Sequence, residues 1–254
     1  MLNVDLQGKT ALITGATGQL GRVMARTLAD CGANIVVHYR GNETKAIELK
    51  QEIESIGRSC MIVQADVTQF DDVLRMRDHI FNHFKTVDII VANAVIQYEW
   101  KSILDQPLED YASQLDTCVM QSVYLSKAFV PAMIERKQGR VIGINTECSM
   151  QNAPGQSAYV AGKRGMDGIY RVLAKEIGAN QITVNQVAPG WTISENDREN
   201  KTEHNEAYEQ SVPLKRRGTD QEIANVVAFL ASDLASFITG AYIPVNGGNV
   251  MPAI

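Results

Sequence analysis

A chain of 254 residues can form one large α/β domain or two small ones, and it is long enough to bury a sizeable core. Its composition, 45% hydrophobic and 21% charged residues, is ordinary for a soluble globular protein. The formal net charge of -5 argues against a nucleic-acid partner, because no basic block is present to neutralise phosphates. The densest basic cluster, the Lys-Arg-Arg run at 215–217, is expected to be a solvated loop.

The sequence carries no sign of secretion or of a membrane. Its cysteines form no Cys-x-x-Cys pair, which favours a reducing compartment and argues against a disulfide framework and a zinc site. Residues 1–15 lack the basic and apolar regions of a signal peptide, and no apolar run approaches membrane-spanning length. We therefore expect a cytoplasmic protein without a membrane partner. The cysteines are Cys31, Cys60, Cys118 and Cys148.

Short runs of β-branched residues alternate with longer amphipathic stretches along the chain. Strands are predicted at 10–14, 34–39, 60–66, 87–94, 139–145, 182–190 and 241–248. Helices are predicted at about 20–30, 45–57, 71–83 and 157–178, and two long helical patterns fill about 107–137. Apolar strands that alternate with helices favour a parallel sheet covered on both faces. Because no linker or repeat divides the chain, we expect one domain over residues 1–254.

The segment 194–211, "SENDRENKTEHNEAYEQS", is unusually polar. Two interpretations are open for it. It could be a disordered insertion, or it could be a mobile lid over a substrate pocket, because such loops often close over sites in α/β proteins.

The stretch "TGATGQLG" places Gly15, Gly18 and Gly21 between the first strand and the first helix. Glycine has no Cβ, so the backbone can turn sharply and a pyrophosphate can approach the first N–H groups of the helix. The helix dipole stabilises such an anion by about 1 kcal/mol. In this strand-turn-helix context the glycines predict a dinucleotide site.

The end of the second strand bears on the choice of cofactor. An NAD site usually has Asp or Glu there to hold the ribose 2′-OH. This chain has no carboxylate at that point, and Arg40 follows the strand at once. Because a guanidinium can bind a 2′-phosphate that a carboxylate would repel, NADP is favoured, with NAD as the alternative.

Tyr159 and Lys163 stand one helical turn apart in "YVAGK". Alone, such a pair is more often a chance feature of a solvated helix face. Its sequence context gives it more weight. Six further motifs accompany the pair: "TGATGQLG" (14–21), "ADVT" (65–68), "ANA" (92–94), "GRVIGIN" (139–145), "NQVAPG" (185–190) and "SFITGAYIPVNGG" (236–248). With these motifs the chain resembles the compact, single-domain branch of the short-chain dehydrogenase/reductase family over nearly its whole length.

The resemblance implies a Rossmann-like, doubly wound parallel sheet of seven strands in the order 3-2-1-4-5-6-7. It also implies a homo-oligomer, a tetramer or a dimer, with contacts through helices at about 120–137 and 157–178. The residues that the glycine turn, Arg40 and the resemblance together assign to the cofactor are Gly15, Thr17, Gly18, Gln19, Leu20, Arg40, Asp66, Val67, Asn93, Ala94, Tyr159, Lys163, Pro189, Gly190 and Thr192.

In this family the tyrosine exchanges a proton with the substrate oxygen, and the lysine binds the nicotinamide ribose and lowers the tyrosine pKa. Lowering a phenol pKa from ~10 to ~7 takes roughly 4 kcal/mol. One cation at ~4 Å in an effective dielectric of ~20 supplies about that much. Lys163, on the same helix face as Tyr159, together with the positive charge of oxidised nicotinamide, is therefore a sufficient source of the expected shift.

Three family positions differ in this chain. The serine that orients the substrate carbonyl is replaced by Thr146, which keeps a hydroxyl donor, with Ser149 as the second candidate. The relay asparagine is replaced by Cys118, whose thiol is a weak donor and acceptor. Val95 stands where the family has glycine and is expected to crowd the nicotinamide. The glycine spacing, Gly18 followed by Gln19, is more typical of the family's longer, epimerase-like branch.

Other reactive side chains form no constellation. Cys148 has no histidine beside it in the sequence and is expected to be an incidental thiol. The histidines show no triad or metal spacing, so no metal is expected. Trp191 and Trp100 are expected either to line the substrate side or to serve in ordinary packing.

These patterns predict an NAD(P)-dependent oxidoreductase that interconverts a carbonyl and an alcohol, with Thr146, Tyr159 and Lys163 as catalytic residues and a small molecule as substrate. A dinucleotide-binding sensor or scaffold with little turnover is the alternative, because Cys118 and Val95 depart from the family. An epimerase or dehydratase is a more distant alternative, since the chain has no room for a second substrate domain.

Overall fold

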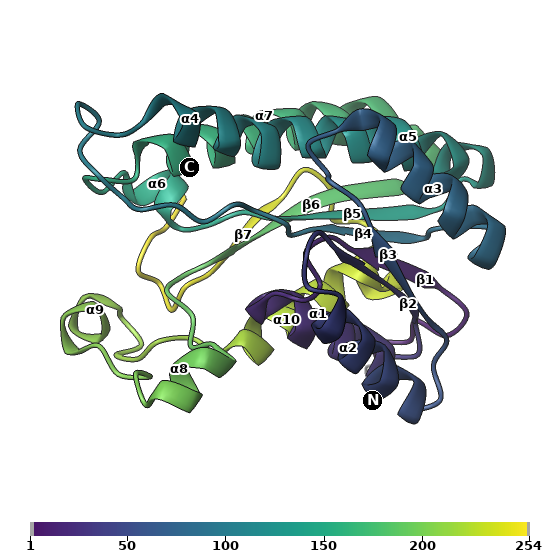
Figure 1. Cartoon of the computed structure of the whole chain (residues 1–254), viewed down its shortest axis with the longest axis horizontal. Coiled ribbons are helices and arrows are strands. Elements are labelled where there is room, and N and C mark those ends of the chain that lie inside the picture. The colour runs from purple at the N-terminus through teal and green to yellow at the C-terminus, as the bar shows by residue number, and fades with distance from the viewer. Residues whose placement is uncertain (1–2, 253–254) are drawn as a thin grey trace.

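The computed structural model describes residues 3–252. Its centre is a seven-stranded parallel sheet with the strand order β3-β2-β1-β4-β5-β6-β7, which confirms the predicted topology (Figure 1). The strands are β1 (Thr10–Ile13), β2 (Asn34–Tyr39), β3 (Cys60–Gln64), β4 (Ile89–Ala92), β5 (Gly139–Ile144), β6 (Ile182–Pro189) and β7 (Tyr242–Val245). Several predicted strands run longer than these, because their last residues leave the sheet to line the site described below.

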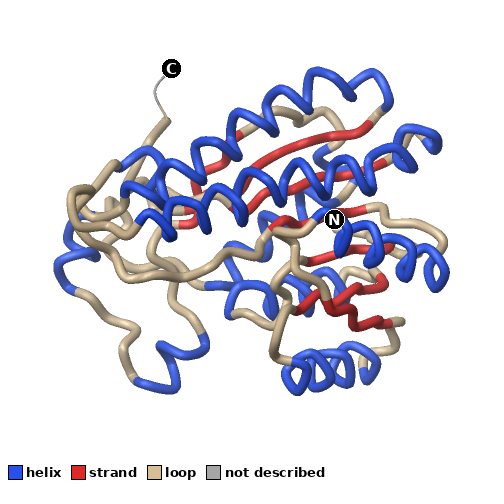
Figure 2. The backbone as a smooth tube through the Cα atoms, turned by 45° about the horizontal axis from the view of Figure 1, so that its top comes forward, coloured by secondary structure: helices blue, strands red, loops and turns tan. Residues whose placement is uncertain are grey.

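Two layers of helices cover the sheet (Figure 1). One face carries α1 (Gln19–Asp30), α2 (Glu43–Ser55) and α10 (Asp220–Ala231), and the other carries α3 (Phe70–Phe84), α4 (Leu108–Gln114), α5 (Gln121–Arg136) and α7 (Ser157–Ile177). Figure 2 shows the long helices of this second layer running alongside the strands. Alternation along β1 sends Ala11 and Ile13 into the first core and Leu12 into the second, as the period of a strand requires.

The helical pattern predicted at 107–137 is almost continuous. Between α4 and α5 lies a π-helical turn, Leu115–Met120, which contains Cys118. Such a turn inserts one residue into the helix and is frequent at functional sites.

The sequence prediction placed no helix between residues 190 and 241, and this was wrong. Besides α10, the structure contains α8 (Glu195–Asn200) and α9 (Glu206–Ser211) there, and the short α6 (Cys148–Gln151) follows β5. The signals for α8 and α10 were present as capping boxes, Ser194 with Asp197 and Thr219 with Glu222. None of the helices within residues 3–252 is long and apolar enough to cross a membrane.

The basic run at 215–217 is not simply a solvated loop. Arg217 is only 2% exposed and donates hydrogen bonds to the carbonyl oxygens of Thr192, Thr202 and Glu203 at 2.8–3.1 Å. It also pairs with Asp197 at 3.2 Å. Arg217 therefore ties together the two ends of the segment that contains α8, a role that local composition could not reveal.

Candidate active site

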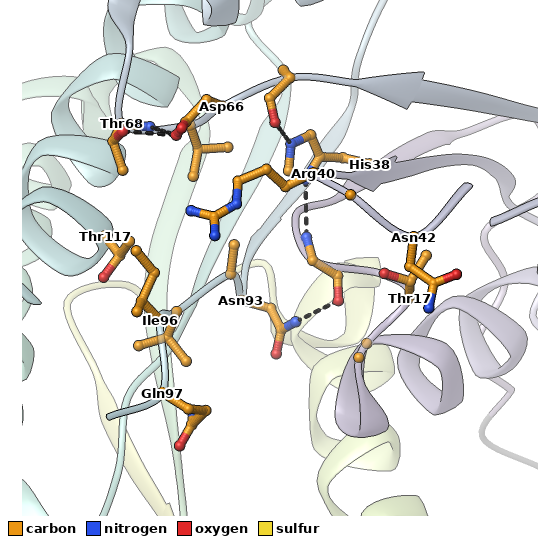
Figure 3. A pocket seen from close by; sticks show the side chains of 18 of the residues that line it. Thr17, His38, Arg40, Asn42, Asp66, Thr68, Asn93, Ile96, Gln97 and Thr117 are labelled. Atoms are coloured by element: carbon orange, nitrogen blue, oxygen red, sulfur yellow. Dashed lines mark hydrogen bonds between the residues drawn. The ribbon is translucent and has the colours of Figure 1, made fainter. Parts of the chain in front are cut away.

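A large cavity of about 730 Å³ lies where β1–β4 end at their carboxyl edge (Figure 3). This is where parallel α/β sheets bind ligands, at the switch in strand order beside β1. The predicted cofactor residues among its lining are Gly15, Thr17, Gly18, Gln19, Leu20, Arg40, Asp66, Val67, Asn93 and Ala94.

A second chamber of about 240 Å³ adjoins the large cavity, and Leu20, Asn93, Val95 and Gln97 line both. The ends of β5 and β6 and the first turns of α7 enclose it. It brings together the remaining predicted site residues: Thr146, Tyr159, Lys163, Pro189, Gly190 and Thr192.

The glycine turn fits a dinucleotide pyrophosphate. Gly15 has φ of +62°, and a Cβ at Gly21 would lie 2.3 Å from the Gly15 carbonyl oxygen, so neither position accepts a side chain without strain. Helix α1 begins at Gln19 after Gly18, and within the described residues no side chain caps its first N–H groups. These N–H groups can therefore donate hydrogen bonds to a bound anion.

His38 holds this turn in place, a role that the sequence did not indicate. It is 1% exposed, and its Nδ1 accepts a hydrogen bond from the Gly15 N–H at 3.0 Å. Nε2 must then carry the proton and donate to the Ala65 carbonyl oxygen at 3.1 Å. Burial lowers the pKa of His38 to about 4. A neutral imidazole thus links the ends of β1, β2 and β3.

Arg40 reaches into the large cavity between Asp66 and Asn93 (Figure 3). Burial opposes ionisation of Asp66, but hydrogen bonds from Thr68 and the charge of Arg40 lower its pKa. The guanidinium is exposed and stands at the end of β2, as the choice of NADP requires.

Lys163 is 2% exposed and lies one turn below Tyr159 on α7. Its Nζ donates to the Ile144 carbonyl oxygen at 2.6 Å and lies 5.7 Å from the centre of the Tyr159 ring. Burial lowers the pKa of Lys163, and the neighbouring Cys118 opposes that effect.

The protein's own groups raise the pKa of Tyr159, whereas the sequence expectation counts the charge of a bound oxidised nicotinamide as well. Burial raises this pKa, Cys148 and Cys118 add to the rise, and the hydrogen bond with Thr146 only partly offsets it. The expected lowering assumed an ammonium group at ~4 Å in an effective dielectric of ~20. In the structure the ammonium group donates to a backbone carbonyl, and desolvation of the buried phenol has the largest effect on its pKa.

The geometry favours Thr146 over Ser149 as the carbonyl-orienting residue. Thr146 lines the small chamber. The Ser149 hydroxyl instead donates to the Thr146 carbonyl oxygen at 2.9 Å and bonds the Tyr242 hydroxyl at 2.7 Å. Ser149 is thus occupied in holding the loop after β5.

The departures from the family pattern surround this chamber. Val95 lines it, whereas Cys118 is fully buried in the π-helical turn, with Sγ 4.0 Å from Gln114 Oε1. Burial raises the pKa of Cys148, which therefore remains a protonated thiol at neutral pH, consistent with an incidental cysteine. No cluster of metal-ligating side chains occurs in residues 3–252.

The two tryptophans, whose role the sequence left open, lie at the small chamber or beside Tyr159. Trp191 lines the small chamber and is 50% exposed, and Trp100 stacks near the Tyr159 ring with centroids 6.1 Å apart. Tyr98, which sequence reasoning missed, accepts a hydrogen bond from the Tyr159 backbone N–H at 2.7 Å. Tyr98 lies in a loop without a motif, so no local sequence pattern indicated that its hydroxyl would contact Tyr159.

The polar segment 194–211 forms α8 and α9 beside these two spaces. At α8, the Asn196 N–H donates to Gln19 Oε1 at 3.3 Å, and Glu195 forms an ion pair with Arg22 of α1. The segment therefore contacts the glycine turn directly. Its movement as a lid stays a prediction.

Comparisons with known proteins agree with this arrangement. Residues 15–249 match the model of a family described as enoyl-(acyl carrier protein) reductase. The chain is 35% identical over 253 residues to a 3-oxoacyl-[acyl-carrier-protein] reductase of Staphylococcus epidermidis, covering 96% of this chain and 99% of the relative. It is 36% identical over 249 residues to the reductase of that name from Pseudomonas aeruginosa, covering 98% and 100%. A solved structure, NAD⁺-bound xylitol dehydrogenase, superposes with a TM-score of 0.89 at 27% identity, covering 95% of this chain and 99% of that one.

Fold, glycine turn and relatives together define an oxidoreductase that depends on a nicotinamide dinucleotide. The chain belongs to the short-chain dehydrogenase/reductase family. The predicted family, fold class and enzyme class are thereby confirmed, and the cofactor prediction is confirmed at the level of a nicotinamide dinucleotide.

Proposed function

We propose that the enzyme reduces a ketone carbonyl to an alcohol with NADPH, using Thr146, Tyr159 and Lys163. The observation that carries this proposal is the convergence of these three side chains on one small chamber that adjoins the dinucleotide cavity. A bound nicotinamide dinucleotide supplies the hydride. The protein's own residues orient the carbonyl and deliver the proton.

In the proposed reaction the Thr146 hydroxyl donates a hydrogen bond to the carbonyl oxygen, and the Tyr159 hydroxyl gives its proton to the same oxygen. The raised pKa of Tyr159 keeps the phenol protonated at neutral pH, which suits a proton donor. In alcohol oxidation Tyr159 acts as base, so the rate in that direction should rise with pH.

The preference for NADPH rests on Arg40. Its guanidinium is exposed at the end of β2, and the cavity lining around it includes Gly41 and Asn42 rather than a carboxylate at the position expected for NAD. Steady-state kinetics with both cofactors tests this: we expect Arg40→Ala to lower the NADPH-to-NADH preference at least about tenfold. A wild-type preference for NADH would remove this role from Arg40.

The chamber favours a substrate that is uncharged next to its carbonyl. Lys163 is the only charged side chain among the described residues that line it, and its ammonium group already donates to Ile144. A free carboxylate beside the reacting carbon would have no cation to compensate its desolvation. Together with the names of the two bacterial relatives, this supports a 3-oxoacyl thioester as the substrate class.

The experiment compares NADPH oxidation with an acetoacetyl thioester of N-acetylcysteamine and with free acetoacetate. We expect the thioester to be reduced with a kcat/KM at least about 100-fold higher, which corresponds to roughly 3 kcal/mol. Tyr159→Phe should abolish turnover and retain NADPH binding. Cofactor binding without turnover on any ketone would instead favour a dinucleotide sensor. The cytoplasmic location, the homo-oligomer and the lid remain predictions of the same proposal.

A further inference from the structure

A buried carboxylate stands directly after Thr146. Glu147 is 4% exposed, and its Oε2 accepts a hydrogen bond from the Asn249 side-chain amide at 3.1 Å. Its Oε1 accepts one from the Tyr208 hydroxyl at 2.8 Å. No ion pair involves Glu147 in the described part of the chain, residues 3–252, so two neutral donors hold it. A buried charge without a cation is costly and therefore calls for a functional reason.

The Tyr208 hydroxyl connects this carboxylate to the wall of the small chamber. Tyr208 lies on α9, and besides donating to Glu147 it accepts a hydrogen bond from the Trp191 backbone N–H at 2.8 Å. The two rings also pack edge to face, with centroids 5.5 Å apart. Trp191 itself lines the chamber next to Gly190. These hydrogen bonds thus connect Glu147, in the loop after β5, through Tyr208 on α9 to Trp191, in the turn after β6.

The fit of the Tyr208 hydroxyl depends on the residue that precedes Trp191. A Cβ at Gly190 would lie 2.5 Å from the Tyr208 hydroxyl oxygen, so only glycine leaves room for this contact. The Trp191 ring also lies against the buried Arg217 guanidinium, whose central carbon is 4.8 Å from the ring centre. Trp191 is therefore held by a ring contact, a cation and a backbone hydrogen bond, although half of its surface is exposed.

We propose that Glu147 and Tyr208 are positioning residues that fix Trp191 as the substrate-side wall of the chamber. This inference rests on the proposed function and deepens it. The pair sets the affinity for the carbonyl substrate, and neither residue lines the large cavity. The charge of Glu147 strengthens the hydrogen bond that orients the Tyr208 hydroxyl toward the Trp191 N–H.

The first test is a split between KM and kcat. Tyr208→Phe removes one oxygen and keeps the ring, so we expect KM for the acetoacetyl thioester to rise about tenfold, the effect of one lost charge-assisted hydrogen bond. The value of kcat should stay within about twofold, less than the tenfold effect of such a bond. Tyr39→Phe is the matched control, because Tyr39 also donates to a glutamate, Glu43, at 3.2 Å but lies outside this region.

Substitutions of Glu147 complete a double-mutant cycle with Tyr208. Glu147→Gln keeps a neutral acceptor for the Tyr208 hydroxyl and should restore only part of the affinity that Glu147→Ala loses, because the charge is gone. The double variant with Glu147→Ala and Tyr208→Phe should be no worse than either single variant, because both break one connection. Equal KM values for Tyr208→Phe and Tyr39→Phe, or additive losses in the double variant, would overturn the proposal.

A second readout does not depend on turnover. The chain has two tryptophans, so Trp100→Phe leaves Trp191 as the only indole emitter. In that background Tyr208→Phe should increase acrylamide quenching of Trp191, and Tyr39→Phe should not. Unchanged quenching would refute the positioning role whatever the substrate is. Increased quenching in a protein that reduces no thioester would support the positioning of Trp191 and count against the proposed function instead.

Discussion

His38 offers the sharpest test of the link between fold and cofactor site. Its imidazole must stay neutral to accept from Gly15 through Nδ1 and donate to Ala65 through Nε2. Protonation would turn both nitrogens into donors and set Nδ1–H against the Gly15 N–H. The perturbation is therefore a fall in pH, compared between the wild type and His38→Asn, whose side chain does not titrate.

The magnitude follows from the pKa. Burial lowers the pKa of His38 from 6.5 to about 4. Between these values the unfolded chain binds a proton that the folded chain does not, so stability falls as pH falls from 6.5 to 4. A difference of about 2.5 pKa units, at 1.36 kcal/mol each, amounts to about 3 kcal/mol of unfolding free energy.

The assay is urea unfolding at pH 7, 6, 5 and 4, at one protein concentration. Between pH 7 and 4 the wild type should lose about 3 kcal/mol more than His38→Asn. His79→Asn, at an exposed histidine of α3, is the control and should follow the wild type. The reasoning is refuted if the two His variants show the same pH dependence, or if NMR finds the His38 imidazole titrating near its ordinary pKa.

Three other substitutions separate parts of the site. Thr146→Ala should lower kcat at least about tenfold, whereas Ser149→Ala should act mainly on stability; the reverse pattern would show that the wrong hydroxyl was assigned. Gly21→Ala should weaken NADPH binding in a fluorescence titration by at least about tenfold, because its Cβ would lie 2.3 Å from a backbone carbonyl oxygen. Gly168→Ala, whose Cβ would meet open space, is the control and should bind NADPH normally. Arg217→Met should lower Tm by about 10 °C, because it leaves buried carbonyls and a carboxylate unpaired; a shift below about 2 °C in thermal denaturation would contradict its clamping role.

The fold could be predicted from the sequence because its signals are local. Each apolar strand is short and continuous, and the glycine turn and the Tyr159–Lys163 spacing are readable within a few residues. The strand order came from the family resemblance, and the sheet has that order. The helix α10 was missed although its capping box was visible, since a polar segment before it masked the start of the pattern.

The environment of each group could not be predicted in the same way. Burial raises the pKa of Tyr159, and both this burial and the position of the Lys163 ammonium group are set by the packing of α7 on β5. His38 and Arg217 looked like an ordinary strand residue and a solvated charge, and both are buried connectors.

By itself the sequence determined which backbone segments form strands and helices, and which chemical groups stand at their ends, because these depend on neighbours along the chain. Only the tertiary structure decided which of these groups are desolvated and which distant partners they contact. Glu147, Tyr208 and Trp191 come from three separate segments and meet only in the folded chain. Electrostatic energies depend on such distances and on burial, neither of which is encoded in local sequence.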